Sequence, residues 1–196
     1  MSYPPITRTP PPSTLSLHAE PGLWALIRED LANHGGRWGA QGFWALAVHR
    51  FGTWRYRIRS PLLRKPLSAL YKLLFKLVQI AAGIELPCEA KVGRGVVIDH
   101  FGGIIVSGYA VIGDGVRLRQ GVSIGLAHCE EPCAPVIGKH VEIGAGAKLM
   151  GRITIGDHAM IGANAVVLKD VPAHHLAIGV PARIRSRKRE EAAMPA

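Results

Sequence analysis

Aliphatic residues recur at every sixth position through the C-terminal half of the chain, and this period limits the possible folds more than any other feature of the sequence. The series comprises Ile137, Ile143, Leu149, Ile155, Ile161 and Val167. A small or aliphatic residue follows each of them after four positions. An α-helix repeats about every 3.6 residues and a β-strand about every two, so neither produces a strict period of six. The period predicts a parallel β-helix, in which each hexad supplies one short strand and one corner, and three hexads complete a triangular coil.

The same pattern extends upstream of this uninterrupted series. It occurs as Val92-Gly93, as Ile112 to Val116 and as Leu118 to Val122, with a slip of two residues in its phase between Ile98 and Ile112. Glycine follows four of the six aliphatic positions in the main series and suits a tight corner, because it adopts backbone conformations that other residues avoid. A β-sandwich, the main alternative, places turns about every 8–12 residues and does not fit this spacing.

Apolar residues at helical spacing occupy three segments before the repeat, over 23–34, 43–58 and 67–84. We expect three helices there, with Pro61 and Pro66 breaking the stretch before the last of them. The last segment contains Lys72 and Lys76, and with 18 residues it is too short and too charged for a comfortable membrane span. We expect it to pack on the core or on a partner subunit, with peripheral contact to a membrane surface as the alternative.

These patterns divide the chain into four parts. They are a disordered Pro-rich N-terminus over 1–20, a helical region over 21–84, a β-helix domain over 85–184 and a basic tail over 185–196. The first part holds five prolines and lacks the apolar segment of a signal peptide. An odd number of cysteines, three, indicates a reducing compartment rather than a disulfide-stapled secreted domain, so we expect a cytoplasmic protein.

The positive charge of the chain is concentrated outside the repeat. The net charge is +10, from 24 Lys and Arg against 14 Asp and Glu. The 54 residues between Asp30 and Glu85 contain nine Lys or Arg and no acidic residue, and a second basic run lies between Arg183 and Arg189. Such charge fits a nucleic acid, an anionic lipid or a phosphorylated ligand. No nucleic-acid-binding motif accompanies it, so we do not expect a nucleic-acid partner.

Several blocks of the repeat resemble those of one known family. GIELPCEAKVGRGVVIDHFGGIIVSGYAVIGDGV, QGVSIG, IGAGAKLMGRITIG, IGANAVVLKDVP and GVPARI are similar to successive segments of the serine O-acetyltransferases, which are hexapeptide-repeat acyltransferases. The match runs from about Gly83 to Ile184. The resemblance implies a left-handed parallel β-helix, acetyl-CoA as co-substrate, transfer to L-serine in cysteine biosynthesis, and a homotrimer or dimer of trimers.

The resemblance also implies the catalytic residues. His100 matches the family's catalytic histidine, which takes the proton from the acceptor hydroxyl during direct transfer. Glu85 matches the carboxylate that holds this histidine, although the family has aspartate at that position. Asp99 matches an active-site aspartate that helps to bind the amino-acid acceptor.

On the acetyl-CoA side, the matching positions are small residues and two cations. They are Gly125, Ala145, Gly146, Ala163, Lys169 and Arg183. Small side chains would let the pantetheine arm lie along the coils, and the two cations would meet phosphates through charge-assisted hydrogen bonds. For each glycine, the geometry of a corner is an equally good explanation. No metal is expected, and neither a GxGxxG fingerprint nor a P-loop occurs.

The sequence departs from the family in the acceptor pocket. The family's Arg-His pair is replaced by Cys133-Ala134, and a family aspartate is missing from the stretch His34 to Trp38. The chain ends in Met194-Pro195-Ala196 rather than in the isoleucine with which many of these enzymes dock a sulfhydrylase, so we expect no such docking. A sugar hydroxyl in exopolysaccharide biosynthesis is therefore an alternative acceptor. A non-catalytic, anion-binding scaffold is a second alternative.

Two further groups of residues raise the question of a metal. His128, Cys129 and Cys133 share one loop, but they lack a second ligand pair at the usual zinc spacing, so a mobile loop is favoured. His174-His175 is interpreted as a solvated turn after Pro172.

Overall fold

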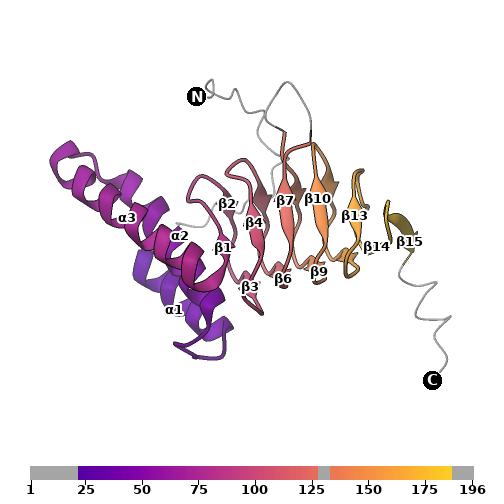
Figure 1. Ribbon diagram of the computed structural model, residues 1–196, viewed down its shortest axis with the longest axis horizontal. Helices are drawn as coiled ribbons and strands as arrows, with labels where there is room; N and C mark the ends of the chain where they lie inside the picture. The colour runs from indigo at the N-terminus through magenta and orange to yellow at the C-terminus, as the bar shows by residue number, and fades with distance from the viewer. Residues whose placement is uncertain (1–21, 128–132, 187–196) are drawn as a thin grey trace.

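A computed structural model describes residues 22–127 and 133–186, with helices at one end of a prism of short strands (Figure 1). The helices are α1 (Leu23–Asn33), α2 (Gln41–Trp54), the short 3-10 helix η1 (Arg55–Arg57) and α3 (Pro61–Ala82). The strands of the first two coils are β1 (Ile84–Glu85), β2 (Lys91–Val92), β3 (Val97–Ile98), β4 (Ile104–Val106), β5 (Val111–Ile112) and β6 (Arg117–Leu118). The strands that follow are β7 (Ser123–Gly125), β8 (Val136–Ile137), β9 (Glu142–Ile143), β10 (Lys148–Met150), β11 (Thr154–Ile155), β12 (Met160–Ile161), β13 (Val166–Val167), β14 (His175–Ile178) and β15 (Arg183–Ser186).

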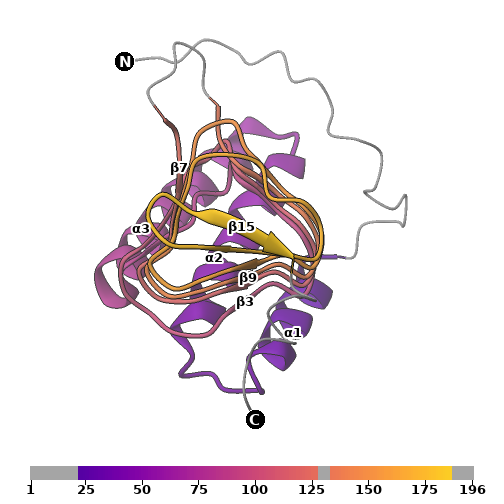
Figure 2. The ribbon, with the colours of Figure 1, turned by 90° about the vertical axis from the view of Figure 1, so that its right-hand side faces the viewer.

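Three parallel sheets form the sides of the prism, as the view along its axis shows (Figure 2). Their strand orders are β1-β4-β7-β10-β13, β11-β8-β5-β2 and β15-β14-β12-β9-β6-β3. From β1 to β13, each step along a sheet skips two strands in sequence, so one coil contains three strands; β14 and β15 then extend the third sheet at its C-terminal end. Only β15 is antiparallel to its neighbour, β14, among the named pairs. The predicted parallel β-helix is confirmed.

Stacked aliphatic side chains fill the prism. The six residues of the period-six series are all 3% exposed or less, and the residues four positions later are buried as well. The strand register places aliphatic side chains of successive coils above one another, so that Ile143 lies between Leu118 and Ile161. Burying a side chain of this size stabilises the fold by about 1.5–3 kcal/mol relative to exposing it, which is why the period of six persists.

The phase slip in the sequence lies in the corner between β3 and β4. Strand register pairs Ile98 with Leu118 and Ile105 with Ser123. Five residues, 99–103, therefore fill this corner where the next coil uses only three, 119–121. Gly102 and Gly103 turn the chain with φ of 97° and 66°, which is the region that favours glycine.

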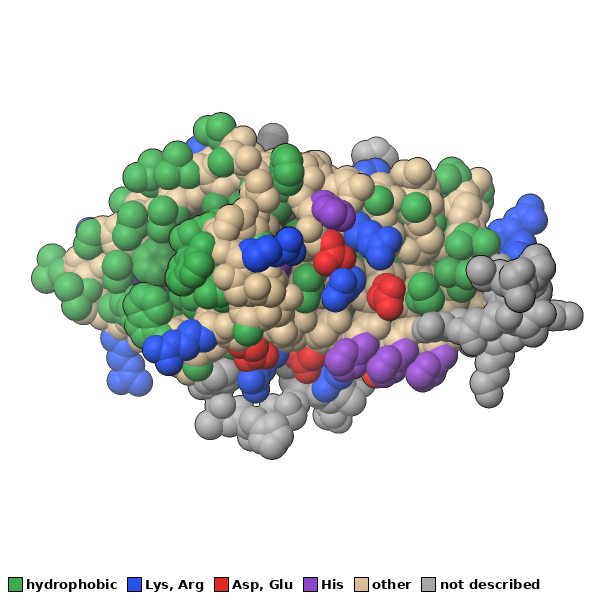
Figure 3. Space-filling view, turned by 90° about the horizontal axis from the view of Figure 1, so that it is seen from below, with side chains coloured by type: hydrophobic (Ala, Val, Ile, Leu, Met, Phe, Trp, Pro, Cys, Tyr) green, Lys and Arg blue, Asp and Glu red, His purple; other side chains and the backbone are tan. Residues whose placement is uncertain are grey.

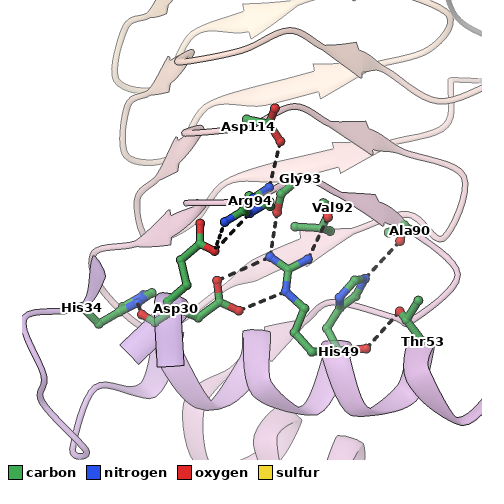
Figure 4. A network of polar contacts seen from close by, with 11 residues as sticks. Asp30, His34, His49, Thr53, Ala90, Val92, Gly93, Arg94 and Asp114 are labelled. Atoms are coloured by element: carbon green, nitrogen blue, oxygen red, sulfur yellow. Dashed lines mark hydrogen bonds and ion pairs between the residues drawn. The ribbon is translucent and has the colours of Figure 1, made fainter. Parts of the chain in front are cut away.

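The helices close the open end of the prism. The first coil has no coil beneath it, so backbone groups on its free edge need other partners. Arg50 of α2 donates to the carbonyl oxygens of Val92 at 2.8 Å and Gly93 at 2.6 Å (Figure 4). The Asp30 carboxylate of α1 accepts from Arg50 Nε at 3.0 Å, so this buried cation is paired. Burial raises the pKa of the Asp30 carboxyl above its ordinary value, although Arg50 acts in the opposite direction.

Two buried histidines also form hydrogen bonds with backbone groups of the first coil. His34 Nδ1 donates to the Asp30 carbonyl at 2.6 Å, and its Nε2 accepts from the Ile98 N–H at 3.2 Å, which fixes a neutral tautomer. His49 Nε2 donates to the Ala90 carbonyl at 3.0 Å. Burial, together with nearby Arg50, lowers the pKa of His49 to about 4. The two rings thus bond helices α1 and α2 to the first coil, and burial keeps His49 neutral in the folded protein.

The structure corrects one expectation about the helices. Pro66 does not break the chain, because α3 begins at Pro61 and runs through it to Ala82. Proline lacks only the N–H that would bond to the Leu62 carbonyl, and Leu62 lies on the exposed side near the helix start, where water can replace that bond. Gly83 then ends α3 in the left-handed conformation with φ of 61°. No described helix is long and apolar enough to cross a membrane.

Candidate active site

The widened corner after β3 presents Asp99 and His100 at the surface. Gly42 of α2 lies directly against β3, since a Cβ on this glycine would be 2.3 Å from the Ile98 carbonyl oxygen. Above, the Asp99 N–H donates to the Leu118 carbonyl at 3.0 Å. Below, the Gly102 N–H donates to the Ala82 carbonyl at 2.8 Å. The corner is thus anchored to the helical cap on one side and to the next coil on the other.

Glu85 approaches the same corner from the first sheet. It ends β1, in register with Ile105 of β4, the strand that the corner leads into. The glycines of the two segments stack closely, because a Cβ on Gly83 would be 3.2 Å from Gly102 Cα. The side chains of Glu85 and His100 are exposed, and neither has a hydrogen-bond or ion-pair partner among the described residues. Both groups are therefore available to each other or to a ligand.

Asp99 has two cationic neighbours that the sequence reasoning did not single out. Arg117 Nη1 donates to the two carboxylate oxygens at 3.2 and 3.4 Å, and Arg119 Nε lies 3.9 Å from Oδ2. Both arginines are about half exposed, whereas Asp99 is 22% exposed. One carboxylate therefore faces two guanidinium groups one coil above it. The alternation Arg-Leu-Arg around buried Leu118 could have shown that both point outward, but not that they face Asp99.

The predicted acetyl-CoA residues fall into separate groups. Ala145, Gly146 and Ala163 lie on one corner in consecutive coils, and the Asn164 N–H bonds to the Ala145 carbonyl at 2.7 Å. Gly146 has φ of 73°, and a Cβ there would be 2.0 Å from Asn164 Oδ1, so the geometry of the corner by itself favours glycine.

The remaining predicted acetyl-CoA residues lie elsewhere on the prism. Gly125 ends β7, and Lys169 follows β13, so both are at the opposite edge of the first sheet from that corner. Arg183 begins β15 on the last coil. Lys169 and Arg183 are exposed. The structure does not bring the six residues together as one cluster within this chain.

The loop that raised the question of a metal is only partly described. His128 and Cys129 lie outside the described residues, whereas Cys133 is buried and disulfide-bonded. Cys88 is buried and free. Within 22–127 and 133–186, no group of three or more His, Cys, Asp or Glu side chains is placed to hold a metal ion.

A row of histidines follows another corner of the prism, and Figure 3 shows it along one edge. The rings of His140, His158 and His174 stack with centroids 5.1 Å apart at each step. All three have left-handed backbone, with φ between 52° and 59°. Stacked parallel rings cannot direct their nitrogen atoms at one ion, so this row is not a metal site. The predicted turn at His174-His175 corresponds to this corner: His174 has left-handed backbone, and His175 begins β14.

Comparison with known proteins identifies similar chains. The family model "Bacterial transferase hexapeptide (six repeats)" matches residues 134–169. A serine acetyltransferase of Helicobacter pylori strain J99 is 37% identical over 135 residues, which cover 68% of this chain and 79% of the relative. One from Synechococcus elongatus is 38% identical over 144 residues, covering 73% and 56%. The chain spans only about half the length of some relatives, such as 50% of the Salmonella typhimurium enzyme.

Solved structures give the same result. The serine acetyltransferase of Brucella abortus strain S19 superimposes with a TM-score of 0.71 at 30% identity, covering 83% of this chain and 69% of that one. The soybean serine acetyltransferase apoenzyme gives 0.73 at 32% identity, covering 85% and 70%. The Brucella protein has also been solved with coenzyme A and the soybean protein with serine. These likenesses confirm the expected fold class, a left-handed parallel β-helix preceded by a small α-helical region.

Proposed function

Because the chain belongs to the serine acetyltransferase family, we propose that it transfers the acetyl group of acetyl-CoA to a hydroxyl, with L-serine as acceptor and O-acetyl-L-serine as product. The observation that carries the proposal is the position of His100. It lies in a widened, exposed corner of the prism, next to the strand that ends in Glu85.

His100 is the proposed general base. Its neutral imidazole takes the proton of the acceptor hydroxyl while that oxygen attacks the thioester carbonyl carbon. A carbon–oxygen bond forms and the carbon–sulfur bond breaks. The imidazolium of His100 then returns the proton to the departing thiolate of CoA. No covalent acyl-enzyme is required, and no second nucleophile is assigned to the site.

Glu85 is the proposed positioning residue for this base. A carboxylate that accepts a hydrogen bond from one ring nitrogen fixes the tautomer of the imidazole and stabilises the imidazolium as it forms. Glutamate is one methylene longer than the family's aspartate, and its position on the outer face of β1 leaves that arm free to turn toward the corner.

The prism surface supports the proposed binding of acetyl-CoA. The small residues Gly125, Ala145, Gly146 and Ala163 leave room for an extended pantetheine arm near the first sheet. Lys169 and Arg183 are exposed cations suited to phosphate groups. Because these six residues lie on different faces and coils, we propose a homotrimer in which neighbouring prisms complete the site.

A thiol-release assay tests the proposal. The full chain is incubated with acetyl-CoA and a series of hydroxyl acceptors, and free CoA is detected with a thiol reagent. We expect saturable release with L-serine and a loss of about 100- to 10,000-fold in kcat for His100→Asn, at unchanged thermal stability. Release that is unaffected by His100→Asn would refute the assigned base. No release with any acceptor would instead support a non-catalytic, anion-binding scaffold.

A sugar hydroxyl is the second candidate acceptor, and the surroundings of Asp99 favour it. An aspartate that meets the amino group of serine should be free, but Asp99 is paired with Arg117 and Arg119. Cys133-Ala134 also supplies no cation for the carboxylate of serine. The double variant Arg117→Gln/Arg119→Gln separates the two acceptors. If the two arginines only pair with Asp99 and keep it from serine, the double variant lowers the KM for L-serine. If they bind the acceptor themselves, the double variant raises the KM for an anionic sugar.

A further inference from the structure

One face of α3 is apolar and has no partner within the described chain. Tyr71, Leu74, Phe75 and Val78 point inward, where they form one cluster with Val48 and Cys88. Away from this cluster, five large apolar residues of α3 are exposed in addition to Leu62 near the helix start: Leu63, Leu70, Leu73, Leu77 and Ile80. These five side chains are between 43% and 74% exposed, which is high for large apolar side chains.

These residues form a continuous stripe. Together with Pro66 they are spaced alternately by three and four positions, which places them along one side of the helix. We name this set the α3 stripe: Leu63, Pro66, Leu70, Leu73, Leu77 and Ile80. The stripe runs from Leu63 to Ile80 along the 22-residue helix, a length of about 27 Å, which is enough for it to act as one surface. Apolar side chains gather at the helical end of the molecule in Figure 3.

The charged residues beside the α3 stripe indicate which kind of partner can bind it. Arg64, Lys65 and Lys72 immediately precede or follow its residues, and Lys76 lies next to Leu77. Helix α3 contains no acidic residue, and none occurs anywhere between positions 31 and 84. A second copy of α3 would therefore bring lysines against lysines with no carboxylate to pair with, which opposes self-association.

We propose that the α3 stripe binds the surface of an anionic lipid membrane. An amphipathic helix with lysine and arginine beside an apolar face lies in the plane of a bilayer, with its apolar side chains among the acyl chains. The cations then face lipid phosphates instead of one another. No described helix could cross a membrane, so the association is peripheral.

The position of α3 relates this surface to the corner that holds His100. The C-terminal residue of α3, Ala82, accepts the hydrogen bond from Gly102 in that corner. In Figure 1, α3 extends away from the prism at the end opposite to β15. A membrane under α3 therefore lies beside the first coil rather than the last. The inference does not depend on which hydroxyl is acetylated, or on whether acetyl transfer occurs.

Vesicle flotation of the full chain tests the proposal. The probes are phosphatidylcholine vesicles and vesicles with about one third phosphatidylglycerol, at low and at high salt. We expect binding to the anionic vesicles only, weakened by salt because the attraction is partly electrostatic. Absence of binding to anionic vesicles at low salt would overturn the proposal.

Variants then separate the stripe from general charge. Leu73→Ser/Leu77→Ser should lower the partition coefficient at least tenfold, and Lys72→Gln/Lys76→Gln about 30-fold, at about a factor of five per cation. Leu168→Ser is the matched control, since Leu168 is as exposed as Leu73 at 57% but lies on the prism. Circular dichroism shows whether each variant folds. If Leu73→Ser/Leu77→Ser floats like the parent, or instead dissociates an oligomer that never bound vesicles, the stripe is not a lipid surface.

Discussion

The prism and the helical cap are stabilised in different ways. Inside the prism, each coil repeats the aliphatic residues of the one before it, and the charges of residues 83–186 nearly balance, with ten basic and nine acidic side chains. The cap, residues 22–82, has ten basic side chains and two acidic ones. It contacts the first coil through buried polar groups such as Arg50 and His49. A repeat can thus satisfy its own interior, whereas its open end requires hydrogen-bond donors supplied by another element.

The largest effect on stability is expected in the cap, from Asp30→Ala. The change leaves the buried Arg50 guanidinium without its carboxylate, which costs about 3–5 kcal/mol in free energy of unfolding. Denaturant unfolding followed by circular dichroism measures it. Glu29→Ala is the control, because it removes the exposed pair with Arg94 and should change stability little. Equal effects of the two changes would show that the buried pair does not hold the cap.

A cavity in the prism should lower the free energy of unfolding slightly less than Asp30→Ala does. Leu149 is fully buried between Ile124 and Val167, so Leu149→Ala removes contacts in three successive coils. We expect a loss of about 2–5 kcal/mol in the free energy of unfolding. The exposed Leu168→Ala should change it by less than about 0.5 kcal/mol. A small effect at Leu149 would mean that neighbouring coils collapse into the space.

The cap should also lose stability in acid through His49. Its pKa is about 4 in the folded protein against 6.5 ordinarily, so the unfolded chain binds more protons between these values. The stability is complete above about pH 6.5 and falls as the pH is lowered toward 4, by about 3 kcal/mol from this group. His49→Gln keeps a donor for the Ala90 carbonyl but cannot titrate. Unfolding curves of the two proteins across this range should therefore differ in slope, and parallel curves would contradict the assignment.

The smallest effect is expected at a corner of the prism. Asn164 has φ of 55°, a conformation that costs alanine about 1–2 kcal/mol and glycine little. Asn164→Ala should lower the free energy of unfolding by about 1 kcal/mol, and Asn164→Gly should lower it less. Thermal unfolding of both variants provides the measurement. Equal losses in the two variants would instead show that contacts of the amide, which both variants lack, matter more than the backbone at this corner.

Much of the architecture could be predicted from the sequence because the repeat is local. The period of six follows from burial of one side of each short strand, and it correctly predicted the residues of the core. The helices were predicted as well, except that α3 begins at Pro61 and continues through Pro66. Proline near the start of an exposed helix loses a single hydrogen bond, and the packed apolar side of α3 outweighs it.

The site was predicted less completely. His100, Glu85 and Asp99 were assigned through resemblance to a family, and their roles stay predictions. The two-residue slip in the period was visible in the sequence, but only strand register shows that it widens the corner that bears His100. The partners of Asp99 needed the structure, since Arg117 and Arg119 follow it by 18 and 20 positions, about one coil later.

The sequence by itself determined the prism, its buried columns and the acid-free, apolar helix that precedes it. These features depend on residues within one or two hexads or helical turns of each other. Only the tertiary structure decided how the cap meets the prism and which charges gather around Asp99. Those contacts join residues as far apart as His34 and Ile98, 64 positions from each other, and no local pattern records such a pairing.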